Sequence, residues 1–185
     1  MHNAFTVRYS GLVNQLLAEI KIIKPQLGPQ DRPKFIQVKA IWDTGATGSV
    51  ITEKIVNILG LAPIGKVTVA GVHGEQEVNQ YLVDIILMNN VRFPEIVVTS
   101  AKSFSSGCHA LIGMDIIGAG DFAVSKNAKG STMSFVVPTI NEIDFVPGSQ
   151  EANFKEKTKG LNREQRRQAE RDARKKGELP PRRNS

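Results

Sequence analysis

The sequence predicts a mostly β domain with one short helix, followed by a charged C-terminal tail. Short apolar runs, several of them alternating with polar residues, recur between turn signals about every 8 to 15 residues, which is typical of a largely antiparallel β architecture. Residues 53–59 have helical features, with Thr52 in a capping position and Gly60 where the helix would end. Residues 151–185 lack a continuous apolar stripe, so we expect a solvated helix or a disordered tail there.

The elements of the domain follow from local composition. Residues 12–23 suit either a helix or a strand, and the alternation near their end favours a strand. Residues 24–33 hold three prolines and a glycine and are expected to be a loop. Pro94 predicts a sheet edge or a bulge, and residues 115–120 could begin as a helical turn. The remaining strands are expected within residues 5–9, 34–41, 49–52, 67–71, 77–87, 91–98, 110–112, 122–125 and 133–137.

The excess positive charge lies in the tail. The chain has a formal net charge of +6, but residues 1–150 contain as many acidic as basic residues. Residues 151–185 contain 12 Lys and Arg and 6 Asp and Glu. Within the tail, Asn162 and Gln165 have the spacing of a capping box, and Gly177 would end the helix. A nucleic-acid partner is therefore expected only through the tail, where a merely solvated charged face is the alternative.

Other features exclude several classes of protein. The single cysteine, Cys108, excludes an internal disulfide framework, and no apolar run is long enough for a membrane span. The N-terminus lacks the features of a signal peptide, so we expect a cytoplasmic protein without a membrane partner. The three histidines lack metal-ligand spacing and no phosphate-binding glycine loop is present, so neither a metal nor a cofactor is expected. Cys108 and His109 are a weak nucleophile–base candidate, because adjacent side chains seldom face each other.

A carboxylate stands directly after the apolar run of residues 40–42. Asp43 opens a sharp turn, Gly45 permits the chain to reverse, and residues 49–52 resume strand-like composition. An aspartate in such a turn often bonds only its own backbone. Here apolar residues flank the turn on both sides, so the carboxylate is expected to be partly buried. Burying a carboxylate is costly unless it is paired or functional, which makes Asp43 the leading catalytic candidate.

Two motifs resemble the retropepsin-like aspartic proteases. Residues 43–47, Asp-Thr-Gly-Ala-Thr, with apolar residues before them and Ser-Val-Ile after, resemble the active-site loop of that family. Residues 110–117, Ala-Leu-Ile-Gly-Met-Asp-Ile-Ile, resemble its later motif of two apolar residues, glycine, any residue and aspartate. The motifs occur in the family's order, and the resemblance covers residues 35–138. It suggests a single-domain member of the bacterial or phage-like kind.

The resemblance implies a closed retropepsin-like β-barrel that acts as a homodimer on peptides or proteins. No second Asp-Thr-Gly or Asp-Ser-Gly occurs, so each protomer would supply one Asp43 to the catalytic dyad. By resemblance, the active-site loop is supported by Thr44, Gly45, Ala46, Gly113 and Asp115, and the substrate-binding flap contains Val72, His73 and Gly74. The domain would cover residues 34–146, after an N-terminal extension of residues 1–33 and before a basic tail of residues 147–185.

Two functions remain open at this point. The leading one is an aspartic endopeptidase that hydrolyses peptide bonds with a water-activating dyad. The alternative is a retropepsin-like module that dimerises or grips peptides without cutting them, accompanied by a nucleic-acid-binding tail. The sequence departs from the minimal family pattern in its bulky Trp42, its proline-rich loop and its tail.

Overall fold

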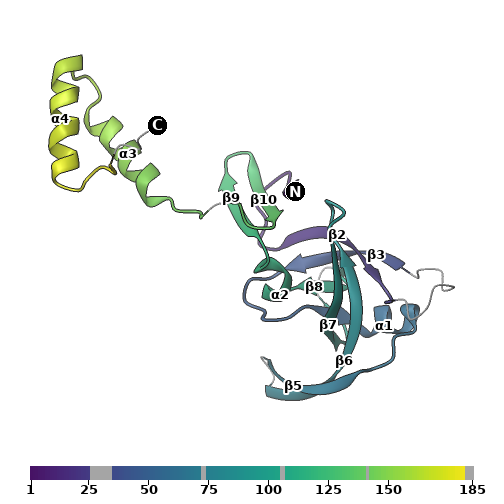
Figure 1. The fold of residues 1–185 in the computed structure, drawn as a ribbon. Helices are drawn as coiled ribbons and strands as arrows, with labels where there is room; N and C mark the ends of the chain where they lie inside the picture. The colour runs from purple at the N-terminus through teal and green to yellow at the C-terminus, as the bar shows by residue number, and fades with distance from the viewer. Residues whose placement is uncertain (26–34, 72–73, 105–106, 141, 182–185) are drawn as a thin grey trace. The chain divides into compact units, whose positions relative to one another are not determined.

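The structure is a computed structural model that describes residues 1–25, 35–71, 74–104, 107–140 and 142–181. Its chain divides into two compact units, Met1–Asn141 and Glu142–Ser185, and each is described by itself (Figure 1). Most of the expected proline-rich loop lies outside the described residues, as do Val72 and His73 of the expected flap.

The first unit is mostly β, as predicted. Its described residues form two short helices, so the expectation of a single helix was wrong. The second helix forms where the sequence indicated only the start of a helical turn. The strands are β1 (Asn3–Arg8), β2 (Leu16–Ile23), β3 (Phe35–Trp42), β4 (Val50–Thr52), β5 (Gly65–Gly71), β6 (Gly74–Ile86), β7 (Arg92–Ala101), β8 (Ala110–Ile112), β9 (Asp121–Asn127) and β10 (Gly130–Val137), and the helices are α1 (Glu53–Leu59) and α2 (Met114–Ile117).

Seven strands form the larger sheet, in the order β2-β3-β8-β4-β7-β6-β5. β2 also pairs with β6, so the described pairings run from β2 through β3, β8, β4, β7 and β6 and return to β2. Most pairs are antiparallel, as expected, but β3 pairs with β8 and β4 pairs with β7 in parallel. These two parallel pairs place the end of β3 beside the end of β8, with Trp42 opposite Ile112.

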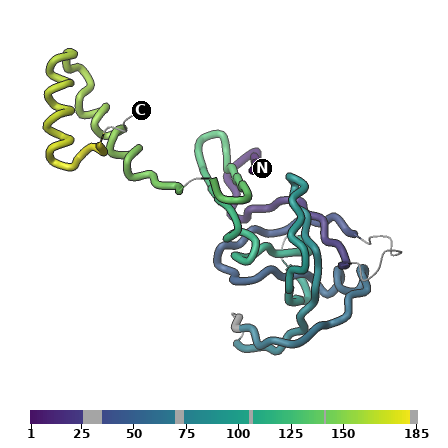
Figure 2. The backbone as a smooth tube through the Cα atoms, viewed as in Figure 1, coloured from purple at the N-terminus to yellow at the C-terminus, as the bar shows by residue number. Residues whose placement is uncertain are grey.

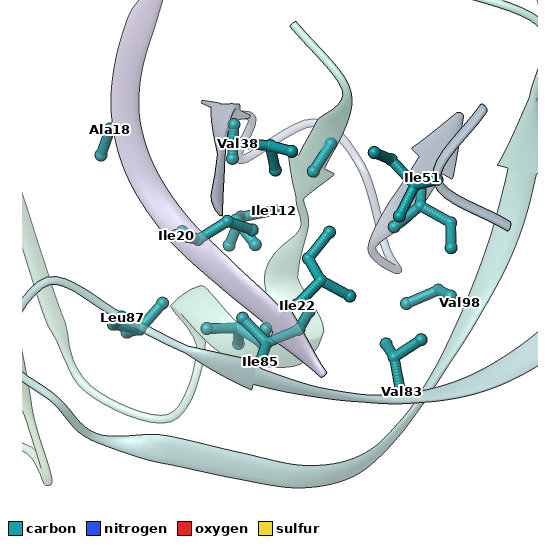
Figure 3. Packing of buried hydrophobic residues seen from close by; sticks show 14 of the residues in the cluster. Ala18, Ile20, Ile22, Val38, Ile51, Val83, Ile85, Leu87, Val98 and Ile112 are labelled. Atoms are coloured by element: carbon teal, nitrogen blue, oxygen red, sulfur yellow. The ribbon is translucent and has the colours of Figure 1, made fainter. Parts of the chain in front are cut away.

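The core of the first unit lies between the paired strands. β2 contributes Ala18, Ile20 and Ile22 from one face, because residues two apart in a strand point to the same side. Figure 3 shows these side chains gathered with others from β3, β4, β6, β7 and β8. The residues once assigned to an N-terminal extension thus include a strand whose apolar face belongs to the core.

α1 begins and ends where the sequence predicted. Gly60 takes the left-handed conformation with φ of +61°, and the amides of Gly60 and Leu61 donate to the carbonyls of Asn57 and Val56. The expected side-chain cap is absent, because the Thr52 hydroxyl makes no bond to the helix. It lies 3.3 Å from Nδ1 of His109 instead, which ties β4 to the segment before β8.

A bulge interrupts the β6–β7 pair close to Pro94, as the sequence indicated. The register shifts between Val83 and Ile85, and Glu95 takes a positive φ of 55°. The buried Asp84 lies between Val83 and Ile85. Its carboxylate accepts from the Arg92 guanidinium and, at 2.8 Å, from the Glu95 amide. A buried carboxylate is tolerated when it is paired and hydrogen-bonded, so this cluster holds the irregular backbone in place.

The smaller sheet of the first unit has the strand order β1-β10-β9. An aromatic cluster connects it with the larger sheet: Trp42 at the end of β3 contacts Phe5 of β1, Phe122 of β9 and Phe135 of β10, with ring centroids 5.1 to 5.7 Å apart. Trp42 is 4% exposed. The residue before Asp43 is therefore anchored by three strands of the other sheet.

The second unit contains α3 (Val146–Lys157) and α4 (Arg163–Lys175), and Figure 2 traces the turn that joins them. Asn162 and Gln165 form the predicted capping box at the start of α4. α3 was not predicted. Its first turn contains Pro147, which costs no helical hydrogen bond at that position. Within the described part of the chain, no helix is both long and apolar enough to span a membrane.

Candidate active site

Asp43 lies at the tip of the loop that joins β3 to β4. Its amide donates to the carbonyl of Ile112 at 3.0 Å, which continues the parallel β3–β8 pairing up to the carboxylate. One carboxylate oxygen, Oδ1, accepts from the Gly45 amide at 2.9 Å. No hydrogen bond from a described residue reaches the other oxygen, Oδ2. The side chain is only half-buried, so one face of the carboxylate is held and the other is available.

Asp115, at the start of α2, holds the β3–β4 loop in place by hydrogen bonds. Asp115 Oδ1 accepts from the Ser49 hydroxyl at 2.8 Å, and Oδ2 accepts from the Ser49 amide at 2.9 Å. The Ser49 hydroxyl also accepts from the Gly113 amide at 3.2 Å. Ser49 is 2% exposed, so these bonds are shielded from water. They join two segments that lie more than 60 residues apart in the chain.

A second link fixes the middle of the loop. The Met114 amide donates to the carbonyl of Ala46 at 2.8 Å. Gly113 allows this approach, because a Cβ atom there would lie 2.6 Å from the carbonyl carbon and oxygen of Gly48. That distance is shorter than real Cβ contacts. The side chain missing at Gly113 is thus what lets the two motifs pack backbone against backbone.

The sequence reasoning missed Ser49. It was read only as the start of a strand, although its side chain occupies the centre of the loop's hydrogen-bond network. A polar residue directly before the apolar Val50 and Ile51 was the one local signal, and it did not reveal its partner. Trp42 was noted for its size, but its aromatic partners come from strands that no local pattern connects.

A family model matches the segment that contains both motifs. Residues 35–119, which run from β3 through α2 and include both motifs, match the family model described as gag-polyprotein putative aspartyl protease. Residues 35–119, a little under half of the chain, are thus similar to the aspartyl proteases that this model describes. The resemblance drawn from Asp43-Thr44-Gly45 and from Gly113-Met114-Asp115 is confirmed by the family model, which spans both motifs.

Solved structures of such proteases are similar to the chain at low identity. The protease of simian foamy virus (mac) is 19% identical over 56% of this chain and 92% of its own, with a TM-score of 0.39. A retropepsin-like aspartic protease from Rickettsia conorii is 11% identical over 74% and 96%, with a TM-score of 0.44. The EIAV protease, solved with the inhibitor HBY-793, is 23% identical over 60% and 92%, with a TM-score of 0.42. No curated protein matches the sequence.

The other expected site residues are placed as follows. Thr44 and Gly45 are exposed at the loop tip, and Ala46 is half-buried below them. Gly74 begins β6, is exposed and has a φ of +96°. Because Val72 and His73 lie outside the described residues, the flap as a whole stays a prediction.

The other catalytic candidate gains no support. Cys108 is 1% exposed, and burial raises the pKa of its thiol although the nearby Lys39 opposes this. A buried thiol with a raised pKa is a poor nucleophile. His109 faces Thr52, as described above. Among the described residues, no group of three or more His, Cys, Asp and Glu side chains is placed to hold a metal ion.

Replacing Asp115 with Asn is expected to loosen the active-site loop. Only the oxygen of the Asn side chain can accept a hydrogen bond. The side-chain nitrogen would therefore face either the Ser49 backbone amide or the Ser49 hydroxyl. Losing a hydrogen bond to a charged group and leaving a buried donor unpaired costs about 1 to 3 kcal/mol. We expect a melting temperature lower by roughly 2 to 10 °C together with slower cleavage.

A matched control is Glu53→Gln, which removes an exposed carboxylate that makes no hydrogen bond to another described residue. Its melting temperature should stay close to that of the wild type. The double variant Ser49→Ala/Asp115→Asn should cost less than the sum of its single variants, because both disrupt one network. Additive effects would contradict the proposed coupling between Ser49 and Asp115.

Proposed function

We propose that the protein is an aspartic endopeptidase that acts as a homodimer, with Asp43 from each protomer forming the catalytic dyad. The observation that carries this proposal is the state of Asp43: a carboxylate at the tip of a loop locked by Ser49 and Asp115, with Oδ2 free of described partners. The family match of residues 35–119 supports the same chemistry.

The dimer follows from the number of motifs. The full sequence has one Asp-Thr-Gly and no Asp-Ser-Gly, so a single chain offers only one member of a dyad. A twofold axis through the loop tips would bring two Asp43 side chains together. Thr44, exposed beside Asp43, would brace the two loops across that axis.

The dyad would hydrolyse a peptide bond without a cofactor. Two carboxylates at such short range share one proton, and aspartic proteases are the standard example. The ionised carboxylate takes a proton from water as the water oxygen attacks the carbonyl carbon, and the protonated partner donates to the carbonyl oxygen. Collapse of the tetrahedral intermediate then breaks the C–N bond, and a proton passes to the leaving amine.

Substrate would lie between the loop tips and the β5–β6 hairpin. Gly45 would present its backbone to the peptide, and the hairpin tip with Val72, His73 and Gly74 would close over it and exclude water. A non-catalytic peptide-binding or dimerisation module would use the same surface. That alternative would not need an acid at position 43.

The test is proteolysis of a mixed peptide library by the purified full chain, over a pH range of about 4 to 7. We expect new peptide termini whose formation rate rises more steeply than linearly with protein concentration in the range where sedimentation shows the dimer assembling. No cleavage at concentrations where the dimer predominates would overturn the endopeptidase and leave the binding module.

A further inference from the structure

α4 presents a row of arginines on one face. Arg163, Arg167 and Arg171 are four residues apart, so they lie one above another along about 12 Å of the helix. Arg174 continues the row, but its guanidinium already donates to Glu170 and to the carbonyl of Pro180. A hollow of about 350 Å³ is lined by Arg167, Glu170, Arg171 and Arg174.

The buried residues of α4 indicate which side of the helix carries this row of arginines. Ala173 is 5% exposed, and Leu179 just beyond the helix is 6% exposed. The capping box at Asn162 fixes the first turn, and Gly177, with φ of +74°, ends the helix. The apolar side of α4 is thus already covered within its own unit, and Arg163, Arg167 and Arg171 lie on the solvent-exposed side.

These three arginines have no acidic partner among the described residues. Among the described residues of the second unit, ion pairs join Arg174 to Glu170 and Lys159 to Glu156, and Asp172 accepts from Gln168. The surrounding residues do not neutralise the charge of these arginines, since residues 151–185 contain twice as many basic as acidic residues. Three guanidinium groups in a row, none paired with an acidic side chain of the described residues, form an electrostatic site for a polyanion.

We propose that the arginine face of α4, formed by Arg163, Arg167 and Arg171, binds the phosphate backbone of nucleic acid. Guanidinium groups match phosphate geometry through paired N–H donors. A nucleic-acid strand offers phosphates at regular intervals along its length, as the helix offers arginines. This inference does not depend on the proposed proteolysis.

Two other polyanions fit the observations less well. A membrane-binding helix needs a broad apolar face for the acyl chains, whereas the apolar side of α4 is small and packed within the unit. An acidic peptide carries negative charge only where its sequence places Asp or Glu, so its charges are not spaced regularly as phosphates are. In the proposed arrangement the three arginines contact phosphates, which carry no sequence information, so we expect binding that depends little on the nucleotide sequence.

The test measures fluorescence anisotropy of a labelled oligonucleotide of about 20 nucleotides, single-stranded or duplex, with the full chain at salt from about 50 to 300 mM. Three phosphate contacts predict a slope of log K against log salt of about −2 to −3. In Arg167→Gln/Arg171→Gln we expect at least about tenfold weaker binding in low salt and a slope shallower by about 2.

The control is Lys126→Gln/Lys129→Gln, which removes the same charge from exposed residues of the β9–β10 hairpin. Its affinity and slope should remain close to those of the wild type, and circular dichroism should show equal helix content in all variants. Wild-type binding that is absent in low salt, insensitive to salt or unchanged by Arg167→Gln/Arg171→Gln would overturn the proposal. So would equal affinity for anionic vesicles or for poly-glutamate.

Discussion

Replacing Asp43 with Asn is expected to slow peptide cleavage by about a thousandfold or more, with little change in stability. General acid–base groups contribute about 10² to 10⁴ in rate, and an amide cannot accept the proton of the attacking water. Asn has the same shape, and its oxygen can still accept from the Gly45 amide as Asp43 Oδ1 does. The measurement is the cleavage rate of one library-derived peptide beside the melting temperature of each variant.

The same variant also tests the dimer. If protomers exchange freely, an equal mixture of wild type and Asp43→Asn leaves about a quarter of the dimers with two aspartates. Activity should fall to about a quarter of that of the same total amount of wild type, whereas a monomeric enzyme would retain about half. The control is Asp144→Asn, which makes the same substitution at an exposed residue of the second unit and should leave activity unchanged. A fall to one half with Asp43→Asn would exclude the shared dyad.

Replacing Gly113 with Ala is expected to displace the active-site loop. The added methyl group would lie 2.6 Å from the carbonyl carbon and oxygen of Gly48 and 3.0 Å from the carbonyl oxygen of Ala46. Backbone atoms cannot rotate away as a flexible side chain can, so the β3–β4 loop has to move. Overpacking of this kind costs about 1 to 3 kcal/mol, and a catalytic group displaced by about 1 Å can lose a hundredfold in rate.

The matched control for Gly113→Ala is Gly48→Ala, in the same loop. A Cβ atom at Gly48 meets nothing within 4 Å, so this variant should keep its melting temperature. Thermal unfolding and cleavage rates of both variants decide the matter. If Gly113→Ala were as stable and as active as Gly48→Ala, the close approach of the two motifs would not position Asp43.

Elements defined by neighbouring residues were predictable from the sequence. α1 was expected over residues 53–59 because Gly60 and Pro63 end a helix by local chemistry, and the capping box of Asn162 and Gln165 is likewise a local pattern. The bulge near Pro94 follows from a residue that cannot donate to a sheet. Asp43 was identified for a similar reason, because its loop has a recognisable order of residues.

Contacts between distant segments were not predictable. The bonds from Ser49 to Asp115 and the parallel β3–β8 pairing depend on how the chain crosses over, which no periodicity records. α3 was missed because Pro147 and Gly148 indicate a loop, although a proline in the first turn leaves the helical hydrogen bonds intact. Thr52 was expected to cap α1, but its hydroxyl faces His109, which is remote in sequence.

The aromatic cluster around Trp42 gives the protein a built-in spectroscopic probe. Trp42 is the only tryptophan of the chain, so all indole emission comes from one position, directly beside Asp43 in sequence. Its ring packs on Phe5, Phe122 and Phe135, and its Nε1 is buried without a hydrogen-bond partner among the described residues. Any event that shifts the β3–β4 loop against the smaller sheet changes the polarity and quenching around that indole. If the proposed peptide binding and dimerisation shift this loop, intrinsic fluorescence will follow them on the unlabelled protein and in real time.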